Sequence, residues 1–375
     1  PTIKPVIEQM VADYEANNPN IKINLTDLTW ADGHDKIVIA FSSGTAPDIV
    51  ELGSDWVAEF STTGQLANLT EYLTADSANY YGWTPAVYDS SIYAQPWILG
   101  TRVLYINKDL MAQAGFDSTF VPYKWDMLKE VCYKIDSLGK DIHGFGSNAA
   151  EKHRLYKKWL PFFWSLDGRI MSLDGKYCVI SSDKAYKSLK FYKELNDSCS
   201  MVDTQRRLED AFLDGKIGVI ISGDWLLKRI KNEKKKINFM TSIFPGLDYP
   251  GKSFAGGEYL AVSKNSPNKE AATKFIKYIT NPENQLVFCK ANYSANPSSK
   301  IAAQDSFFVS DLNLNTFVRQ MNLSKMSPPM TQWVYVEGII EQTLENVLFN
   351  GVPMAESLYD AKHKIEDLVL NKKDE

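Results

Sequence analysis

Four tryptophan residues stand at the ends of predicted strands and helices, where side chains can reach a ligand. They are Trp30, Trp56, Trp97 and Trp225. In α/β folds, ligands bind where strands end and helices begin. An indole ring offers a flat apolar face to the C–H surface of a sugar, while Asp55, Arg102 and backbone N–H groups can satisfy the sugar hydroxyls. We therefore expect these four indoles to line a ligand site, whereas Trp125 lies in the apolar stripe of a helix and is expected in a core.

The residues that usually carry catalysis lack the spacing that catalysis needs. The sequence contains no GxGxxG, GxxxxGK[ST] or GxSxG motif, and Gly144–Ser147 resembles a nucleophile elbow only loosely because the serine follows the second glycine. Its four histidines are scattered and none forms HExxH, while its four cysteines form no CxxC. We expect no catalytic residues, no metal and no cofactor. Buried free thiols are favoured over a Cys178–Cys199 disulfide.

Composition limits the classes of protein further. A length of 375 residues predicts two to three domains, and 44% hydrophobic with 23% charged residues is ordinary globular usage. The net charge of −5 argues against a nucleic-acid partner. No apolar run approaches the roughly 18 residues of a membrane span. The 9 Trp, 19 Tyr and 18 Phe residues favour recognition of something with flat apolar faces.

The elements that must position these residues alternate along the chain. Apolar residues at helical spacing predict helices, and short alternating or continuous apolar runs predict strands. The expected helices include 5–17, 54–64 with Ser54 as N-cap, 125–139 and 183–196. Strands are expected over 21–25, 48–52, 103–106 and 217–221, with a hairpin about Asp174-Gly175. Strands separated by helices predict an α/β architecture with mostly parallel sheets.

Four segments in a fixed order carry a family resemblance. They are Thr45-Ala46-Pro47-Asp48 continuing to Leu66, Tyr93-Ala94-Gln95-Pro96-Trp97 continuing to Leu110, Ala211–Lys216 with Gly223-Asp224-Trp225, and Gly256–Val262 continuing to Ala272. Together they resemble the family 1 extracellular solute-binding proteins, the maltose-binding-protein-like sugar-binding component of ABC importers. One departure is that members usually begin with a strand before the first helix, whereas this chain starts at that helix; the strand is either trimmed or replaced.

The resemblance implies a type II periplasmic-binding-protein fold of two α/β lobes, with a ligand cleft between the lobes and hinges at the crossing segments. The first lobe would comprise 1–106, with 259–303 returning to it. The second would comprise 107–258, with 304–375 packing on it as C-terminal helices. The implied hinges lie near 105–107 and 258–260, with a further passage near 306–314.

The resemblance also implies which residues face the ligand. From the first lobe they are Trp30, Asp55, Trp56 and Arg102, joined by Tyr293 and by Trp97 from the strand-end argument. From the second lobe they are Trp164, Trp225 and Trp333, and the return crossing adds Gly257 and Glu258.

The function implied is a non-enzymatic receptor that captures a sugar or oligosaccharide and delivers it to an ABC transporter permease. A polyamine or cation receptor of the same fold is an alternative, because Asp55, Asp224 and Glu258 could place carboxylates beside the aromatic rings. A glycoside-active enzyme using two carboxylates is a third. We expect a monomer exported to the periplasm or held at the cell surface as a lipoprotein, with its signal sequence outside this chain.

Overall fold

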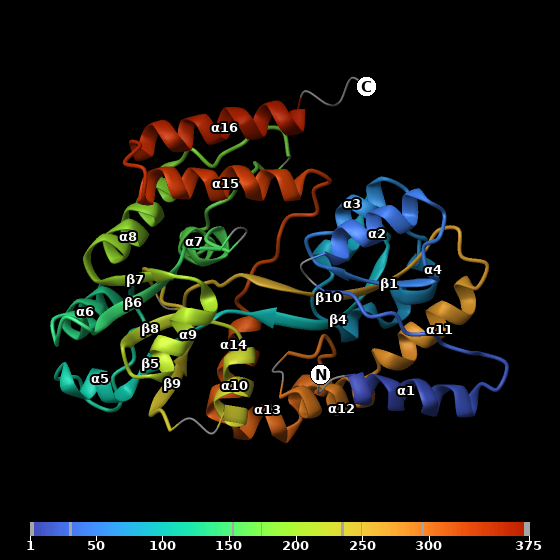
Figure 1. Cartoon of the computed structure of the whole chain (residues 1–375). Coiled ribbons are helices and arrows are strands. Elements are labelled where there is room, and N and C mark those ends of the chain that lie inside the picture. Colours follow the sequence, from blue (N-terminus) through green and yellow to red (C-terminus); the bar gives the residue numbers. More distant parts are fainter. Residues whose placement is uncertain are drawn as a thin grey trace. The chain divides into compact units, whose positions relative to one another are not determined.

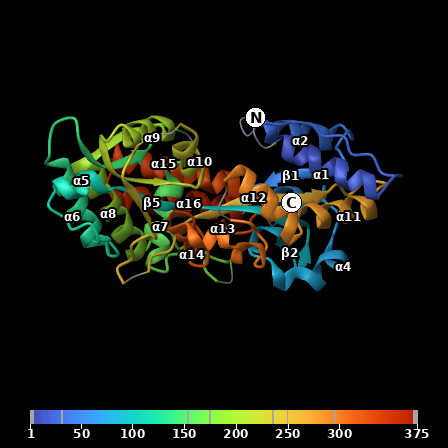
Figure 2. The same ribbon diagram turned by 90° about the horizontal axis from the view of Figure 1, so that it is seen from below.

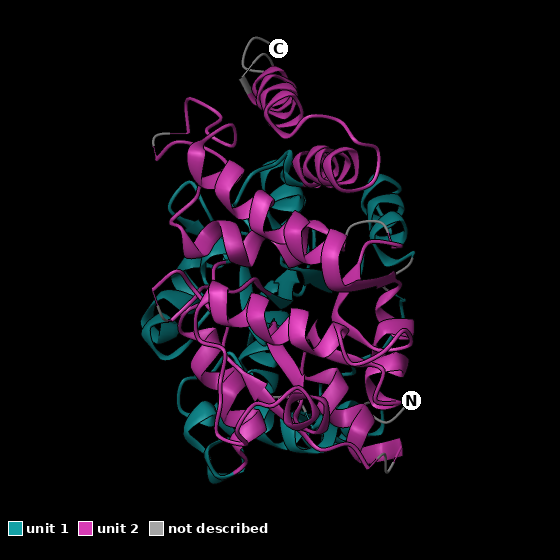
Figure 3. Ribbon diagram, turned by 90° about the vertical axis from the view of Figure 1, so that its left-hand side faces the viewer, with its two compact units in different colours: residues 1–100, 256–310, 326–333 teal, residues 101–255, 311–325, 334–375 magenta. Residues whose placement is uncertain are grey.

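The chain divides into two units, which are coloured separately in Figure 3. The computed structural model describes residues 4–29, 32–151, 154–173, 175–233, 236–248, 250–293 and 296–370. Unit 1 comprises residues 1–100, 256–310 and 326–333, and unit 2 comprises 101–255, 311–325 and 334–375. The chain thus first passes between the units after residues 100 and 255, whereas the expected passages lay after residues 106 and 258. The segment 326–333 was expected in the second lobe and belongs to unit 1. Each unit is described by itself below.

Unit 1 is organised around a three-stranded sheet in the order β1-β10-β4. The strands are β1 (Ile49–Gly53), β10 (Ala255–Val262) and β4 (Ala94–Thr101), and a small hairpin pairs β2 (Val87–Tyr88) with β3 (Ser91–Ile92). The helices are α1 (Lys4–Asn17), α2 (Gly33–Ser42), α3 (Val57–Thr62), α4 (Thr70–Leu73), α11 (Lys269–Ile279), α12 (Pro282–Asn292) and α13 (Ser306–Ser310). Three short 3-10 helices add η1 (Thr74–Asn79), η2 (Thr84–Ala86) and η3 (Ala302–Gln304).

Helix α1 forms because its apolar residues recur on one face. Met10, Val11 and Tyr14 are buried on that face. The Tyr14 ring meets Phe275 of α11 edge to face, with ring centroids 5.1 Å apart. As a result α1 packs along α11 and α12 (Figures 1 and 2). The predicted helix over 5–17 is confirmed.

Unit 2 contains a five-stranded sheet in the order β7-β6-β8-β5-β9. The strands are β5 (Val103–Asn107), β6 (His143–Asn148), β7 (Ser200–Asp203), β8 (Ile217–Ser222) and β9 (Phe239–Ser242). The helices are α5 (Lys108–Gln113), α6 (Trp125–Asp136), α7 (Tyr156–Ser165), α8 (Asp183–Cys199), α9 (Gln205–Leu213), α10 (Trp225–Glu233), α14 (Leu312–Met321), α15 (Trp333–Leu348) and α16 (Met354–Leu370). Trp333 itself belongs to unit 1.

The core of unit 2 includes the helix predicted from the spacing of Trp125, Leu128, Cys132 and Ile135, all of which are buried in α6. The Trp125 ring stacks on Phe191 of α8 at a centroid distance of 4.7 Å. Its indole N–H donates to the carbonyl of Pro245 over 3.1 Å, so a buried donor is satisfied. The assignment of Trp125 to a core is confirmed.

The prediction of mostly parallel sheets is wrong. Among the strand pairs whose direction is given by the described residues, the parallel ones are β6 with β7 and β6 with β8. Strand β5 runs antiparallel to both β8 and β9, and β1 runs antiparallel to β10. The helix crossovers that impose parallel pairing connect β6, β7 and β8. Strand β5 follows β4 after a single residue, so no crossover helix fixes its direction.

Two predicted strand segments do not form strands. Residues 21–25 are irregular. Leu25 is 44% exposed and Ile21 and Ile23 are only partly buried, so the alternating apolar side chains do not form a face that packs in a core. The Ile23 N–H instead donates to Glu15 over 2.7 Å. The hairpin about Gly175 reduces to one bridge between Met171 and Cys178, and Asp174 lies outside the described residues.

The four cysteines, Cys132, Cys178, Cys199 and Cys289, are buried and free, which confirms the sequence prediction. Among the residues that the structure describes, none of the helices has the length and apolarity needed to cross a lipid bilayer.

Candidate ligand-binding site

The parallel strands of unit 2 bring three loops to one edge of the sheet. Strands β6, β7 and β8 end at Asn148, Asp203 and Ser222, and because they run parallel their carboxyl ends share that edge. Helix α9 begins two residues after β7 and α10 begins three residues after β8, at Trp225. This is the edge at which α/β sheets bind ligands.

Trp225 presents the most exposed indole at this edge, with 39% of its surface open to solvent. The guanidinium carbon of Arg102 lies 4.5 Å from the centroid of the Trp225 ring, in a cation–π contact. A side chain on Gly223 would overlap the indole, so glycine is required there for the ring to lie against the backbone. The Tyr105 hydroxyl fixes that turn by donating to the Gly223 carbonyl over 2.7 Å. Unit 2 thus brings together Trp225 and Arg102, both predicted as site residues.

A buried carboxylate beneath Trp225 was missed by the sequence analysis. Glu209 of α9 is 4% exposed. Its Oε1 accepts hydrogen bonds from Trp225 Nε1 over 2.7 Å, from Ser222 Oγ over 2.8 Å and from Gln205 Nε2 over 2.9 Å. Its Oε2 lies 3.6 Å from the guanidinium of Arg229. The available signal was its helical position, next to the buried Leu208 and three residues before the buried Phe212, which places an acid on the inner face of α9.

Lys158 is a second buried charged residue near this edge. Its Nζ donates to the carbonyl of Ile221 over 2.8 Å. Burial lowers the pKa of the Lys158 ammonium well below 10.5, and the positive charges of Arg102 and Arg154 lower it further, against the opposing effect of Glu209 and Glu151. Lys158 and Glu209 are each 4% exposed, so these two charged groups are buried rather than solvated.

In unit 1, Asp55 and Trp56 lie in the loop after β1, two and three residues beyond Gly53, and both are partly exposed. The Ser327 hydroxyl donates to Asp55 Oδ1 over 2.8 Å. The Trp56 ring meets the ring of His34 edge to face at 5.2 Å, and His34 Nε2 lies 2.9 Å from Glu59. Helix α3 starts at Val57 without a side-chain cap, so the expected helix start at Ser54 is wrong.

Gly257 and Glu258 lie on β10 beside this loop. Glu258 is paired with Gly53, the last residue of β1. The Gly257 carbonyl accepts from the Ser54 N–H over 2.9 Å, and a Cβ on Gly257 would come within 2.6 Å of the Ile98 carbonyl. Glycine therefore permits the close approach of β10 to β4, next to Glu258, which pairs with the end of β1.

The other predicted site residues are placed differently. Trp97 is buried against Phe288, with centroids 4.9 Å apart, and Trp164 is buried and stacked on Phe254 at 5.9 Å. Trp333 is 1% exposed at the start of α15. Tyr293 ends α12 in the left-handed conformation, with φ 51°, and meets Phe307 edge to face. Trp30 lies outside the described residues.

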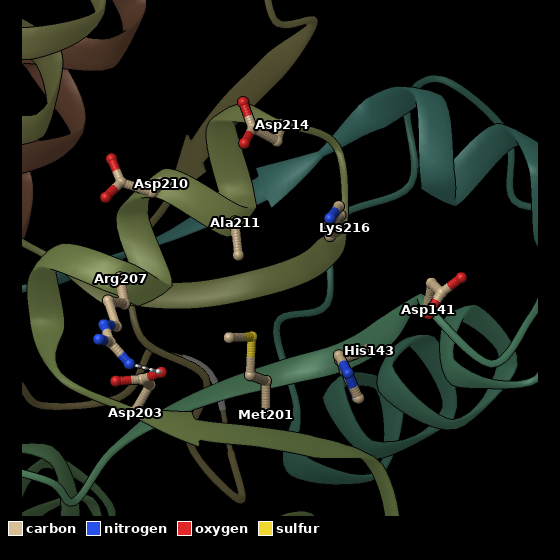
Figure 4. Close-up of a pocket in the computed structure, with 9 residues that line it drawn as sticks. All are labelled: Asp141, His143, Met201, Asp203, Arg207, Asp210, Ala211, Asp214 and Lys216. Carbon is tan, nitrogen blue, oxygen red and sulfur yellow. Dashed lines mark ion pairs between the residues drawn. The ribbon is translucent and has the colours of Figure 1, made fainter.

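A separate open depression of about 450 Å³ lies beside β6, β7 and α9 in unit 2 (Figure 4). Charged side chains line it together with Met201 and Ala211, and Arg207 is paired with Asp203. It has no Trp, Tyr or Phe side chain among its lining residues, and so it lacks the large rings on which a sugar stacks. Within the described ranges, no group of three or more His, Cys, Asp or Glu side chains could hold a metal ion.

Comparison with known proteins identifies the family. The model of the bacterial extracellular solute-binding proteins matches residues 1–286. This chain belongs to that family. The chain is 27% identical to a binding protein of Brucella abortus over 98% of its length and 90% of that protein. It is 23% identical to the maltooligosaccharide ABC transporter solute-binding lipoprotein of Streptococcus pneumoniae R6, covering 98% and 85% of the two chains.

Among solved structures, the sugar-binding protein MalE of Xanthomonas citri superposes with a TM-score of 0.88 at 23% identity, covering 98% of this chain and 95% of that one. This solute-binding protein therefore has the type II periplasmic-binding-protein fold, as the sequence predicted.

Proposed function

We propose that this protein is a non-catalytic receptor that binds a sugar or oligosaccharide and delivers it to an ABC transporter permease. The observation that carries the proposal is the Trp225 indole, which is exposed at the carboxyl edge of the unit 2 sheet and fixed there by Glu209. Family membership and the names of relatives support the same class of function. We further propose export, to the periplasm or to the cell surface as a lipoprotein, and action as a monomer.

The chemistry of the proposed contact follows from the ring. One face of a sugar carries C–H groups that stack on an indole, while its hydroxyls require hydrogen-bonding partners at the rim. Arg102 supplies a donor next to Trp225. In unit 1, we propose that Asp55, two residues after β1, and Glu258, paired with the last residue of β1, supply acceptors. We propose that both units contribute to ligand binding and that binding draws them together about the chain crossings.

A calorimetric screen tests the choice of ligand. A ligand at 100 times its Kd stabilises a protein by about 2.7 kcal/mol, which raises the melting temperature measurably. Maltooligosaccharides, other neutral oligosaccharides and polyamines are added separately. We expect sugars to raise the melting temperature. Stabilisation by polyamines alone would show that the protein is a cation receptor instead. We do not expect this result, because the positive charge of Arg102 lies over the Trp225 ring and disfavours a cationic ligand there.

Two further measurements test the rest of the proposal. Incubation with the bound oligosaccharide, followed by chromatography, should return it intact; cleavage products would show a glycoside-active enzyme.

Uptake of the radiolabelled sugar should be lost when the coding gene is deleted and restored when the gene is returned. Uptake that persists without the gene would remove the delivery step.

A further inference from the structure

The Trp225 indole N–H donates to a carboxylate that is almost fully buried. Trp225 is the first residue of α10, where a large aromatic side chain could adopt more than one rotamer. Its Nε1 donates to Glu209 Oε1 over 2.7 Å, which is short for a nitrogen donor and typical of a charge-assisted hydrogen bond. Because 39% of Trp225 is exposed, packing alone restrains the ring less than it would in a core.

Glu209 is itself fixed from several sides. Ser222, at the end of β8, and Gln205, one turn earlier on α9, donate to the same oxygen that accepts from Trp225. Arg229, one turn after Trp225 on α10, places its guanidinium 3.6 Å from the other oxygen. Arg229 is held in turn by ion pairs with Asp210 and Glu233. The carboxylate therefore ties the end of β8, α9 and the first two turns of α10 to the indole.

Resting on the proposed function, we propose that Glu209 is a positioning residue for the sugar platform. Its carboxylate fixes the rotation of the Trp225 ring, so that the ring is already in the orientation that stacks on a sugar when the ligand arrives. A preorganised ring binds more tightly because no rotamer freedom is lost on binding. Glu209 itself is buried and contributes to affinity through Trp225.

Asp210 provides a matched control. It is the next residue on α9 and also pairs with Arg229, but it makes no hydrogen bond to Trp225. Asp210→Asn therefore removes an acidic partner of Arg229 while leaving the indole contact intact. Glu209→Met removes the acceptor at similar side-chain volume, and Glu209→Gln removes the charge while keeping an oxygen that can accept from the indole.

The first readout needs no sugar. Protein labelled with ¹⁵N-tryptophan shows one indole N–H resonance for each Trp, and Trp225→Phe identifies the resonance of Trp225. We expect slow hydrogen exchange at this N–H in the wild type and in Asp210→Asn, and fast exchange in Glu209→Met. Fast exchange in the wild type would overturn the proposal, because the indole would then not be held.

The second readout is the Kd for maltotriose, measured by calorimetry. Loss of a hydrogen bond to a charged group predicts that Glu209→Met weakens binding about tenfold. Asp210→Asn should stay within twofold of the wild type and Glu209→Gln within about threefold. In a Trp225→Phe background, Glu209→Met should weaken binding by less than twofold, because the donor is already gone. Equal weakening in both backgrounds, or no weakening by Glu209→Met, would overturn the positioning role.

The two readouts separate this inference from the proposed function. If wild-type protein binds no sugar in the ligand screen, the proposed function fails whatever the exchange data show. If the wild type binds maltotriose and the indole resonance behaves as expected but the affinities do not, the positioning role alone fails. If Glu209→Met does not fold, Glu209→Gln and Asp210→Asn are compared instead. Slower exchange of the Trp225 indole N–H and higher sugar affinity in Asp210→Asn than in Glu209→Gln would support the role of the charge. The reverse order would overturn it.

Discussion

The indoles of Trp225 and Trp164 should respond in opposite ways to substitution by alanine. Trp225 is 39% exposed, so Trp225→Ala should cost little stability but weaken sugar binding by about 2 kcal/mol, more than tenfold in Kd. Trp164 is 4% exposed and stacked on Phe254, so Trp164→Ala should destabilise the protein by about 3–5 kcal/mol. Urea denaturation and calorimetry measure the two effects. A large loss of stability in Trp225→Ala with unchanged affinity would make Trp225 a packing residue.

Lys158 should make the stability of the protein depend on alkaline pH. Its pKa in the folded protein lies well below 10.5, chiefly because of burial, so between the two values the unfolded chain binds more protons. The free energy of unfolding therefore rises with pH in that window, by up to about 1.4 kcal/mol per pH unit, and this contribution is lost as pH falls through the folded pKa.

Lys158→Met removes this titrating group. We expect the stability of the wild type relative to Lys158→Met to increase from pH 7 to pH 10 in urea denaturation. Lys364→Met serves as the control for the loss of a lysine charge, because Lys364 is exposed and paired with Asp360. Parallel curves for the wild type and Lys158→Met would show that Lys158 is not perturbed as described.

Residues of the candidate site differ in how far the sequence could reveal them. Trp225 and Arg102 were predictable, because a tryptophan after Gly223-Asp224 follows a buried strand and Arg102 precedes another. Glu209 was not predictable as a site residue, because its contact with the indole requires that Trp225 of α10 lie beside α9 in the folded protein. For Trp97 and Trp164 the sequence could not distinguish a ligand site from a core, because a tryptophan near a strand end or within a helix suits both. The structure shows that Trp97 packs on Phe288 and Trp164 on Phe254.

At the scale of elements, the packing of β6 on α6 depends on Gly144. A Cβ at this position would overlap the backbone carbonyl of Cys132, which cannot move without shifting the helix. Gly144→Ala should therefore destabilise the protein by about 1–3 kcal/mol. Gly139, just after α6, has its nearest neighbouring atom 4.0 Å from such a Cβ, so Gly139→Ala should stay within about 0.5 kcal/mol. Similar urea midpoints for the two variants would contradict this account.

Elements were predictable where their sequence pattern coincided with burial. Helix α6 follows from the spacing of Trp125, Leu128 and Ile135, all of which reach a core. The segment 21–25 has an equally clear alternation, yet it lies against no core and forms no strand. Strand direction was not predictable for β5, because an antiparallel strand can follow its predecessor without a helix between them.

For the whole molecule, ligand binding should reduce the radius of gyration. If both units contact the sugar, as we propose, the ligand favours a more closed state, in which both sets of partners engage it. The backbone can rotate at the passages near residues 100–101 and 255–256 without unpacking either core. Small-angle scattering with and without maltotriose measures the change. An unchanged radius at saturation, starting from an open unliganded state, would remove the closure while leaving the binding proposal intact.

The division of the chain also bears on how the molecule is made. Unit 1 includes residues 326–333 and unit 2 includes residues 334–375, so neither unit has all its segments until the chain beyond residue 326 has left the ribosome. Proteins whose domains follow one another in sequence can fold them one at a time during synthesis. Here residue 333 must be synthesised before unit 1 is complete, and the segment after it before unit 2 is complete. Nascent chains stalled before residue 326 should thus be digested readily by protease in both units, whereas the released full-length chain should resist.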